Sequence, residues 1–145
     1  MSIEGVSSLH GYGSFAPRGG ASLYLSPRDL VTLAKLVAQG APIDLRLDPP
    51  PPEMIEIAPI TMVRLVPLAE GALVVRSSEG GVLEFAAGPD ARDILADTLR
   101  NLARASEMPI GPVCRHVDLE YFPGDRLLAE TSMWVTILLL EDSGA

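Results

Sequence analysis

The amino-acid sequence predicts an α+β fold, a two-layer sandwich in which two amphipathic helices pack on one face of a mainly antiparallel sheet of about six to seven strands. Two observations indicate this fold class. Apolar residues recur at helical spacing in two segments, one that begins at Pro27 and one that covers 90–105. Short segments that alternate apolar and polar residues surround both helices, and a period of two is typical of half-exposed strands.

The first helix has well-marked ends. Ser26 is a suitable capping residue and Pro27 suits the first helical position. Gly40, which is followed closely by a proline, is expected to end the helix. Alternating segments at 21–25 and 43–47 predict one strand before this helix and one after it.

The middle of the chain is rich in proline and in strand signals. Four consecutive prolines at 49–52 predict a stiff, extended loop that has no backbone donors. A β-rich stretch follows at 54–68, and its internal prolines favour an edge strand or a bulge. The clearest hairpin signal joins 72–76 to 82–86 through the turn at 77–81.

A second helix and two further strands complete the pattern. Asp90 is expected to cap a helix over 90–105, because apolar side chains follow it at helical spacing. The segment 113–122 alternates in polarity and predicts a strand. The segment 133–140 is almost continuously apolar, so we expect it to lie in the centre of the sheet.

A length of 145 residues predicts one domain over 1–145. Residues 1–20 are rich in glycine and serine and are expected to form an irregular arm or one short strand. The order strand–helix–strand–strand occurs twice, over 21–66 and over 82–140. This repeated layout is consistent with an internal β-α-β-β duplication.

The composition excludes several classes of protein. Nineteen acidic residues against eleven basic ones give a formal charge of −8, which argues against a nucleic-acid binder because phosphate contacts need a basic surface. A single cysteine, Cys114, excludes an internal disulfide and a thiolate metal cage. The sequence shows neither a secretory signal nor an apolar run of about 20 residues, so we expect a cytoplasmic protein that does not contact membranes.

The group of polar residues that best fits a functional site lies in the segment 113–122. His116, Asp118 and Glu120 are spaced two apart, which places them on one face of a strand. A histidine and two carboxylates could bind a divalent metal ion or act as general acid and base, with Cys114 on the same face as a nucleophile. However, successive side chains on one strand face are about 7 Å apart and converge poorly on one ion. A solvated sheet face or an acidic protein-binding face is therefore favoured, and we assign no catalytic residue, metal ligand or cofactor.

The same region resembles a known protein family. The stretch His116-Val117-Asp118-Leu119-Glu120-Tyr121-Phe122-Pro123-Gly124-Asp125, followed by Leu128-Ala129-Glu130-Thr131-Ser132, resembles the C-terminal signature of the immunity protein 32 family of bacterial polymorphic toxin systems. The resemblance covers about 82–140 and includes the second helix. The chain departs from the family pattern at Asp118 and Asp125, where the family tends to carry histidines.

This resemblance implies a non-enzymatic inhibitor that binds and neutralises a cognate protein toxin. Many such toxins are nucleases with basic active sites, which an acidic surface would complement. The partner-binding residues would lie in the acidic strand–turn region and are His116, Asp118, Glu120, Asp125 and Glu130. The residues leave two other functions open: a small enzyme or metal-dependent protein that uses the His/Asp/Glu strand face, and a structural homo-oligomer such as a homodimer.

Overall fold

The first helix forms where the sequence predicts it in the computed structural model, which describes residues 6–105 and 115–140. Helix α1 covers Pro27–Gln39. Ser26 caps it, and the Ser26 Oγ accepts a hydrogen bond of 3.1 Å from a backbone N–H of the first turn. The helix ends at Gly40, which adopts the left-handed conformation (φ 70°) that glycine tolerates without strain.

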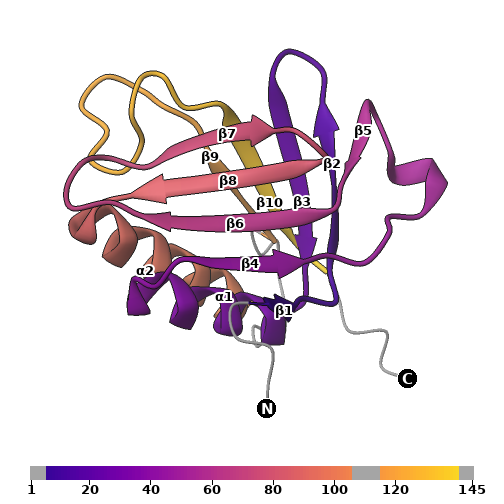
Figure 1. The fold of residues 1–145 in the computed structure, drawn as a ribbon, viewed down its shortest axis with the longest axis horizontal. Coiled ribbons are helices and arrows are strands. Elements are labelled where there is room, and N and C mark those ends of the chain that lie inside the picture. Colours follow the sequence, from indigo (N-terminus) through magenta and orange to yellow (C-terminus); the bar gives the residue numbers. More distant parts are fainter. Residues whose placement is uncertain (1–5, 106–114, 141–145) are drawn as a thin grey trace.

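The second helix begins slightly earlier than predicted. Helix α2 covers Pro89–Ala105, so Asp90 lies inside the first turn and does not cap the helix as expected. Its carboxylate still lies near the positive end of the helix dipole. Figure 1 shows α1 and α2 side by side, and the end of α1 at Gly40 lies beside Arg92 near the start of α2. Neither helix is long and apolar enough to cross a membrane, in the part of the chain that the structure describes.

Ten strands in the described residues form two five-stranded sheets (Figure 1). Sheet A consists, in spatial order, of β1 (Val6–Ser8), β4 (Ile43–Arg46), β6 (Met62–Pro67), β8 (Val82–Ala87) and β7 (Val74–Ser78). Sheet B consists, in spatial order, of β5 (Ala58–Ile60), β2 (Tyr12–Ala16), β3 (Gly20–Leu25), β10 (Trp134–Leu139) and β9 (His116–Leu119). Both sheets are mixed, because β1–β4, β6–β8 and β3–β10 are parallel pairs and the other neighbours are antiparallel.

The α+β class and the two helices are confirmed, but the prediction of one mainly antiparallel sheet is wrong. An alternating pattern identifies a strand without identifying its partner. The pair β3–β10 aligns Gly20 with Trp134, and no local pattern signals a pairing between residues so far apart in the chain. The segment 1–20 is also not an irregular arm throughout, because it contributes β1 and β2.

Other sequence predictions hold. The predicted hairpin is the antiparallel pair β7–β8. The apolar segment near the C-terminal end is β10, which lies between β3 and β9 inside sheet B as expected. The strand predicted over 113–122 is shorter, because β9 covers four residues and the positions 113 and 114 lie outside the described residues.

The path of the chain interlocks the two sheets. After β2 and β3 in sheet B, α1 leads the chain to β4 in sheet A. After β7 and β8 in sheet A, α2 leads the chain back to β9 in sheet B. The two sheets share one arrangement of four strands: an antiparallel hairpin, then a strand parallel to the hairpin's second strand, then an antiparallel strand. In sheet B these strands are β2, β3, β10 and β9, and in sheet A they are β7, β8, β6 and β4. Each sheet combines a hairpin from one half of the chain with two strands from the other half. That this layout arose by an internal duplication stays a prediction.

The hydrophobic core lies where the helices meet the inner faces of both sheets. Leu33 of α1, Leu99 of α2, Phe85 of β8 and Ile137 of β10 gather around one point, and each is at most 4% exposed. Burying a side chain of this size contributes about 1.5–3 kcal/mol relative to leaving it in water. Because the helices occupy the inner side, the outer faces of sheet A and sheet B are free to carry polar and aromatic side chains.

Candidate functional site

Two of the predicted site residues lie together on the outer face of sheet B. The side chains of His116 and Asp118 are exposed, whereas Val117 and Leu119 point to the opposite face and pack against the core. His116 Nε2 lies 3.7 Å from Asp118 Oδ2. Thr136 on the neighbouring strand β10 donates a hydrogen bond of 2.8 Å from its Oγ1 to Asp118 Oδ1. The predicted alternation of this strand is therefore confirmed for its described part.

The other three predicted residues lie beyond the end of β9. Glu120 and Glu130 are exposed. Asp125 is half-buried and holds a turn: its Oδ1 accepts a hydrogen bond of 2.8 Å from the Leu127 N–H, and its own N–H donates to the Phe122 carbonyl at 2.9 Å. The structure thus brings His116 and Asp118 into contact, while the Asp125 carboxylate is occupied in shaping the loop.

No metal centre is found in the part of the chain that the structure describes. Within residues 6–105 and 115–140, no three His, Cys, Asp or Glu side chains lie close enough to hold one ion. Cys114, which the sequence places on the same strand face as His116, lies outside the described residues. The alternative function as a metal-dependent protein therefore has no ligand set among the described residues.

Sequence reasoning missed the neighbours of His116 and Asp118. In the register of sheet B, His116 aligns with Leu138, which aligns with Tyr24, which aligns with Tyr12. The next row aligns Asp118 with Thr136, Ser22 and Ser14, and a third row aligns Trp134 with Gly20. We call the half-exposed and exposed part of this face the platform; its side chains are Tyr12, Ser22, Tyr24, His116, Asp118, Trp134, Thr136 and Leu138.

Three aromatic rings on the platform are held in defined positions. The rings of Tyr12 and Tyr24 stack with their centroids 5.0 Å apart and an interplanar angle of 23°. The indole of Trp134 lies flat against Gly20, because a Cβ built on Gly20 would overlap the ring. Position 20 therefore requires a glycine, because the Trp134 indole lies too close to its backbone for any side chain. The alternating pattern of β3 in the sequence gives no sign of this contact.

A buried hydroxyl fixes one border of the platform. Ser14 on β2 is 1% exposed, and its Oγ accepts a hydrogen bond of 2.9 Å from the Glu56 N–H. The same hydroxyl lies 3.2 Å from the Ala58 carbonyl, to which it can donate. These bonds hold the loop that follows the short helix η1 (Pro52–Met54) against β2. This loop includes Ile57, whose side chain is 62% exposed.

The environment of the platform disfavours ionisation of Tyr24. Burial is the largest cause that raises the pKa of the Tyr24 phenol, and the nearby Tyr12 and Glu56 raise it further, because a phenolate would be partly desolvated and would face negative charge. Tyr24 therefore keeps its hydroxyl proton over the physiological range and presents a donor at the surface.

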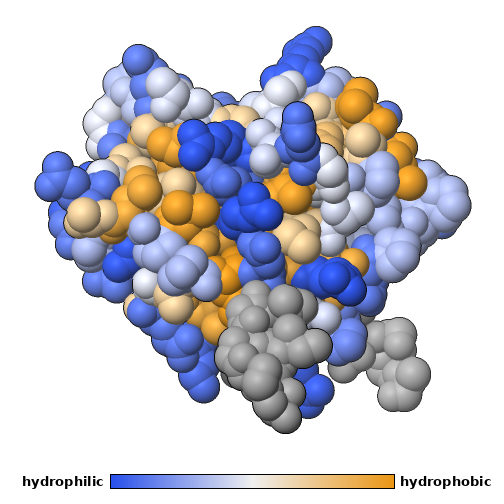
Figure 2. All heavy atoms as spheres, in the orientation of Figure 1, coloured by the Kyte–Doolittle hydropathy of each residue, from blue (hydrophilic) through white to orange (hydrophobic). Residues whose placement is uncertain are grey.

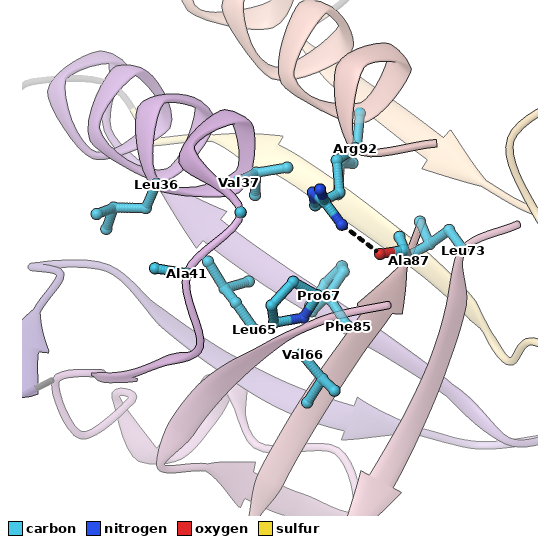
Figure 3. A pocket seen from close by; sticks show the side chains of 12 residues that line it. Leu36, Val37, Ala41, Leu65, Val66, Pro67, Leu73, Phe85, Ala87 and Arg92 are labelled. Carbon is cyan, nitrogen blue, oxygen red and sulfur yellow. Dashed lines mark hydrogen bonds between the residues drawn. The ribbon is translucent and has the colours of Figure 1, made fainter. Parts of the chain in front are cut away.

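A small cavity elsewhere in the molecule does not provide a ligand site (Figure 3). It lies between the two helices and the ends of β6 and β8, and its volume of about 20 Å³ is close to the space of one water molecule. Arg92 reaches toward it from α2, and Arg92 Nη1 donates to the Ala87 carbonyl at 2.9 Å. The guanidinium also lies beside Gly40 at the C-terminal end of α1, where a positive charge is favourable. Arg92 thus joins α2 to β8 and to the end of α1.

Comparisons with protein-family models, with curated proteins and with solved structures find no match to this chain.

Replacing Gly20 with alanine is expected to displace the Trp134 indole, because the new methyl group would occupy the space of the ring. Trp134 is the only tryptophan in the chain, so the intrinsic fluorescence reports it alone. We expect a red-shifted emission maximum, easier quenching by acrylamide and a loss of about 1–3 kcal/mol of stability. The matched control is Gly13→Ala, whose methyl group would overlap the Ser22 carbonyl and Leu23 away from the indole. An emission spectrum of Gly20→Ala identical to that of the wild type would contradict the packing described here.

The raised pKa of Tyr24 predicts a loss of stability at high pH. Above the ordinary tyrosine pKa of 10.0, the Tyr24 phenol of the unfolded chain loses its proton, whereas that of the folded chain keeps it. The contribution of Tyr24 to the free energy of unfolding is therefore complete below pH 10.0 and is lost as the pH rises through the pKa of the folded state. Urea unfolding at pH 8 and at pH 10.5 should show a smaller decline for Tyr24→Phe than for the wild type. Tyr121→Phe, which keeps Tyr24, should decline like the wild type. An equal decline in all three proteins would refute the assignment.

Proposed function

We propose that this chain is a non-enzymatic binding protein that neutralises a cognate protein toxin, as its resemblance to the immunity protein 32 family implies, and that the platform and the adjacent turn receive the partner. The observation that carries this proposal is the platform itself: two tyrosines, a tryptophan, a histidine and a carboxylate share one sheet face, on which each of these side chains is exposed or half-exposed. The proposal also gives a use to His116 and Asp118, which the sequence singled out.

The residue types on the platform are those that protein interfaces favour. Tyrosine and tryptophan are enriched at such interfaces, because each buries a large apolar area and still offers a polar group for a hydrogen bond. The stacked tyrosine pair and the Trp134 indole are already fixed by their neighbours, so little side-chain freedom is lost on binding. The hydroxyls of Ser22 and Thr136 add polar contacts between these rings.

The turn after β9 extends this surface with a hydrophobic anchor. Phe122 is 61% exposed, and the hydrogen bond between the Asp125 N–H and its carbonyl holds it at the turn. The loop joins β9 to β10 and returns to the sheet at Trp134, so it lies next to one end of the platform. Exposed carboxylates of Glu120 and Glu130 belong to the same loop. An exposed aromatic ring among carboxylates suits a partner with an apolar pocket and a basic rim.

The overall charge supports the same class of partner. A formal charge of −8 steers association with a basic protein and makes the rate of association sensitive to salt. A nuclease toxin with a basic active site fits this description. The proposed compartment is the cytoplasm, and no nucleic acid or membrane is proposed as a partner.

The test is co-expression with the protein encoded by the adjacent gene, followed by measurement of growth and of binding affinity. We expect the chain to relieve toxicity and to co-purify with that protein. The variant Phe122→Ala should weaken binding by about tenfold or more, because a truncated aromatic anchor at an interface has an effect of this size. Val31→Ala on α1, which removes another exposed apolar side chain (53% exposed), is the matched control and should bind like the wild type.

Two results would contradict the proposed function. One is a neighbouring protein that is neither toxic nor co-purified with the chain. The other is equal affinity of the wild type and of Phe122→Ala for a partner that does co-purify.

A further inference from the structure

The outer face of sheet A carries an ordered row of charges. Asp44 on β4 aligns with Arg64 on β6, Arg64 aligns with Glu84 on β8, and Glu84 aligns with Arg76 on β7. The signs along this row alternate between negative and positive. We call these four residues the charge row.

Neighbours in the charge row are paired within the chain. Arg64 Nε lies 2.9 Å from Asp44 Oδ1, and Arg76 Nε lies 2.7 Å from Glu84 Oε2. The hydrogen bond to Asp44 and the charge of Asp44 raise the pKa of the Arg64 guanidinium, and Glu84 adds to this effect. The row combines two acidic and two basic side chains, so its formal charges sum to zero.

Apolar side chains border the charge row on both sides. Met62 aligns with Val82 on one side, and Val66 aligns with Ala86 and Val74 on the other. Figure 3 shows the Val66 side chain pointing away from the cavity. In Figure 2, which shows the front of sheet A, blue residues cross this face between orange ones. Val82 and Ala86 are buried, so the half-exposed apolar part of this face consists of Met62, Val66 and Val74.

The charge row is complementary to a copy of itself. A twofold axis that runs parallel to the strands, between β6 and β8, would place Arg64 opposite the Glu84 of a second copy. The same axis would place Asp44 opposite the second copy's Arg76. It would also place each apolar row against its own counterpart, whereas a twofold axis perpendicular to the strands would place every charge opposite its own sign.

We propose that two copies of this chain associate face to face through the outer surfaces of their A sheets, with the charge rows in antiparallel register. A closed twofold interface of this kind is the commonest form of homo-oligomer. Because each charge is already paired within its own chain, the desolvation penalty that opposes buried ions is reduced. The proposal does not rest on the proposed function, since the platform belongs to sheet B.

The size of the face predicts a weak dimer. Four strands of four to six residues, spaced about 4.8 Å apart, cover roughly 20 Å by 20 Å at most, which is about 400 Å² on each copy. The total of about 800 Å² lies below the roughly 1,200–2,000 Å² that stable, specific interfaces bury and is typical of weak, transient association. We therefore expect a dimer that forms at high micromolar protein concentration and dissociates on dilution.

The test is sedimentation velocity of the full chain over a range of concentrations. The wild type should approach the mass of two chains as the concentration rises. Arg64→Glu alone and Glu84→Arg alone should stay monomeric, because each places like charges opposite each other. An equimolar mixture of the two variants should dimerise again, because Glu at position 64 then faces Arg at position 84.

Two further variants separate this effect from a folding defect. Arg28→Glu reverses an exposed charge on α1 and should dimerise like the wild type. Leu68→Asp changes an apolar residue that is 38% exposed and lies two positions after Val66, and it leaves the charge row intact; it should reduce dimerisation. A wild type that stays monomeric at several hundred micromolar would overturn the proposal. So would a mixture of the two charge variants that fails to dimerise although each variant is folded by circular dichroism.

Discussion

The structure depends on two parallel strand pairs, β3–β10 in sheet B and β6–β8 in sheet A. Each pair joins strands from opposite halves of the chain, so neither sheet can be completed by one half alone. The helices follow from this constraint, because α1 and α2 carry the chain from one sheet to the other. They pack against each other and against both inner faces, where Leu33, Leu99 and Ile137 are buried together.

The same constraint determines where surface chemistry is placed. The interlocked core uses the inner face of each sheet, which leaves two outer faces with different properties. Sheet B carries stacked aromatic rings with His116 and Asp118, and sheet A carries a row of alternating charges between apolar side chains. We propose the first face as the binding surface for a partner protein and the second as the contact with a second copy of the chain. A dimer through sheet A would leave both platforms free.

Local sequence patterns predicted the elements well and their partners poorly. Ser26 and Gly40 mark the ends of α1 through hydrogen bonds and backbone conformation that depend only on nearby residues. The pairing of Gly20 with Trp134 depends on the whole fold, so neither the two sheets nor the aromatic platform could be predicted from the sequence. For the candidate site, a period of two placed His116 and Asp118 on one face correctly. The same reasoning gave no sign that the Asp125 carboxylate holds a turn, because that role depends on the conformation of the loop.

The most direct test of the interlocked fold is to divide the chain between Ala69 and Glu70, in the loop that separates β6 from β7. The fragments 1–69 and 70–145 would be produced separately and then mixed. Circular dichroism and urea unfolding should show no cooperative transition for either fragment alone, because each lacks one partner of both parallel pairs. The equimolar mixture should form a one-to-one complex with a cooperative transition. Cooperative unfolding of either isolated fragment would contradict this account.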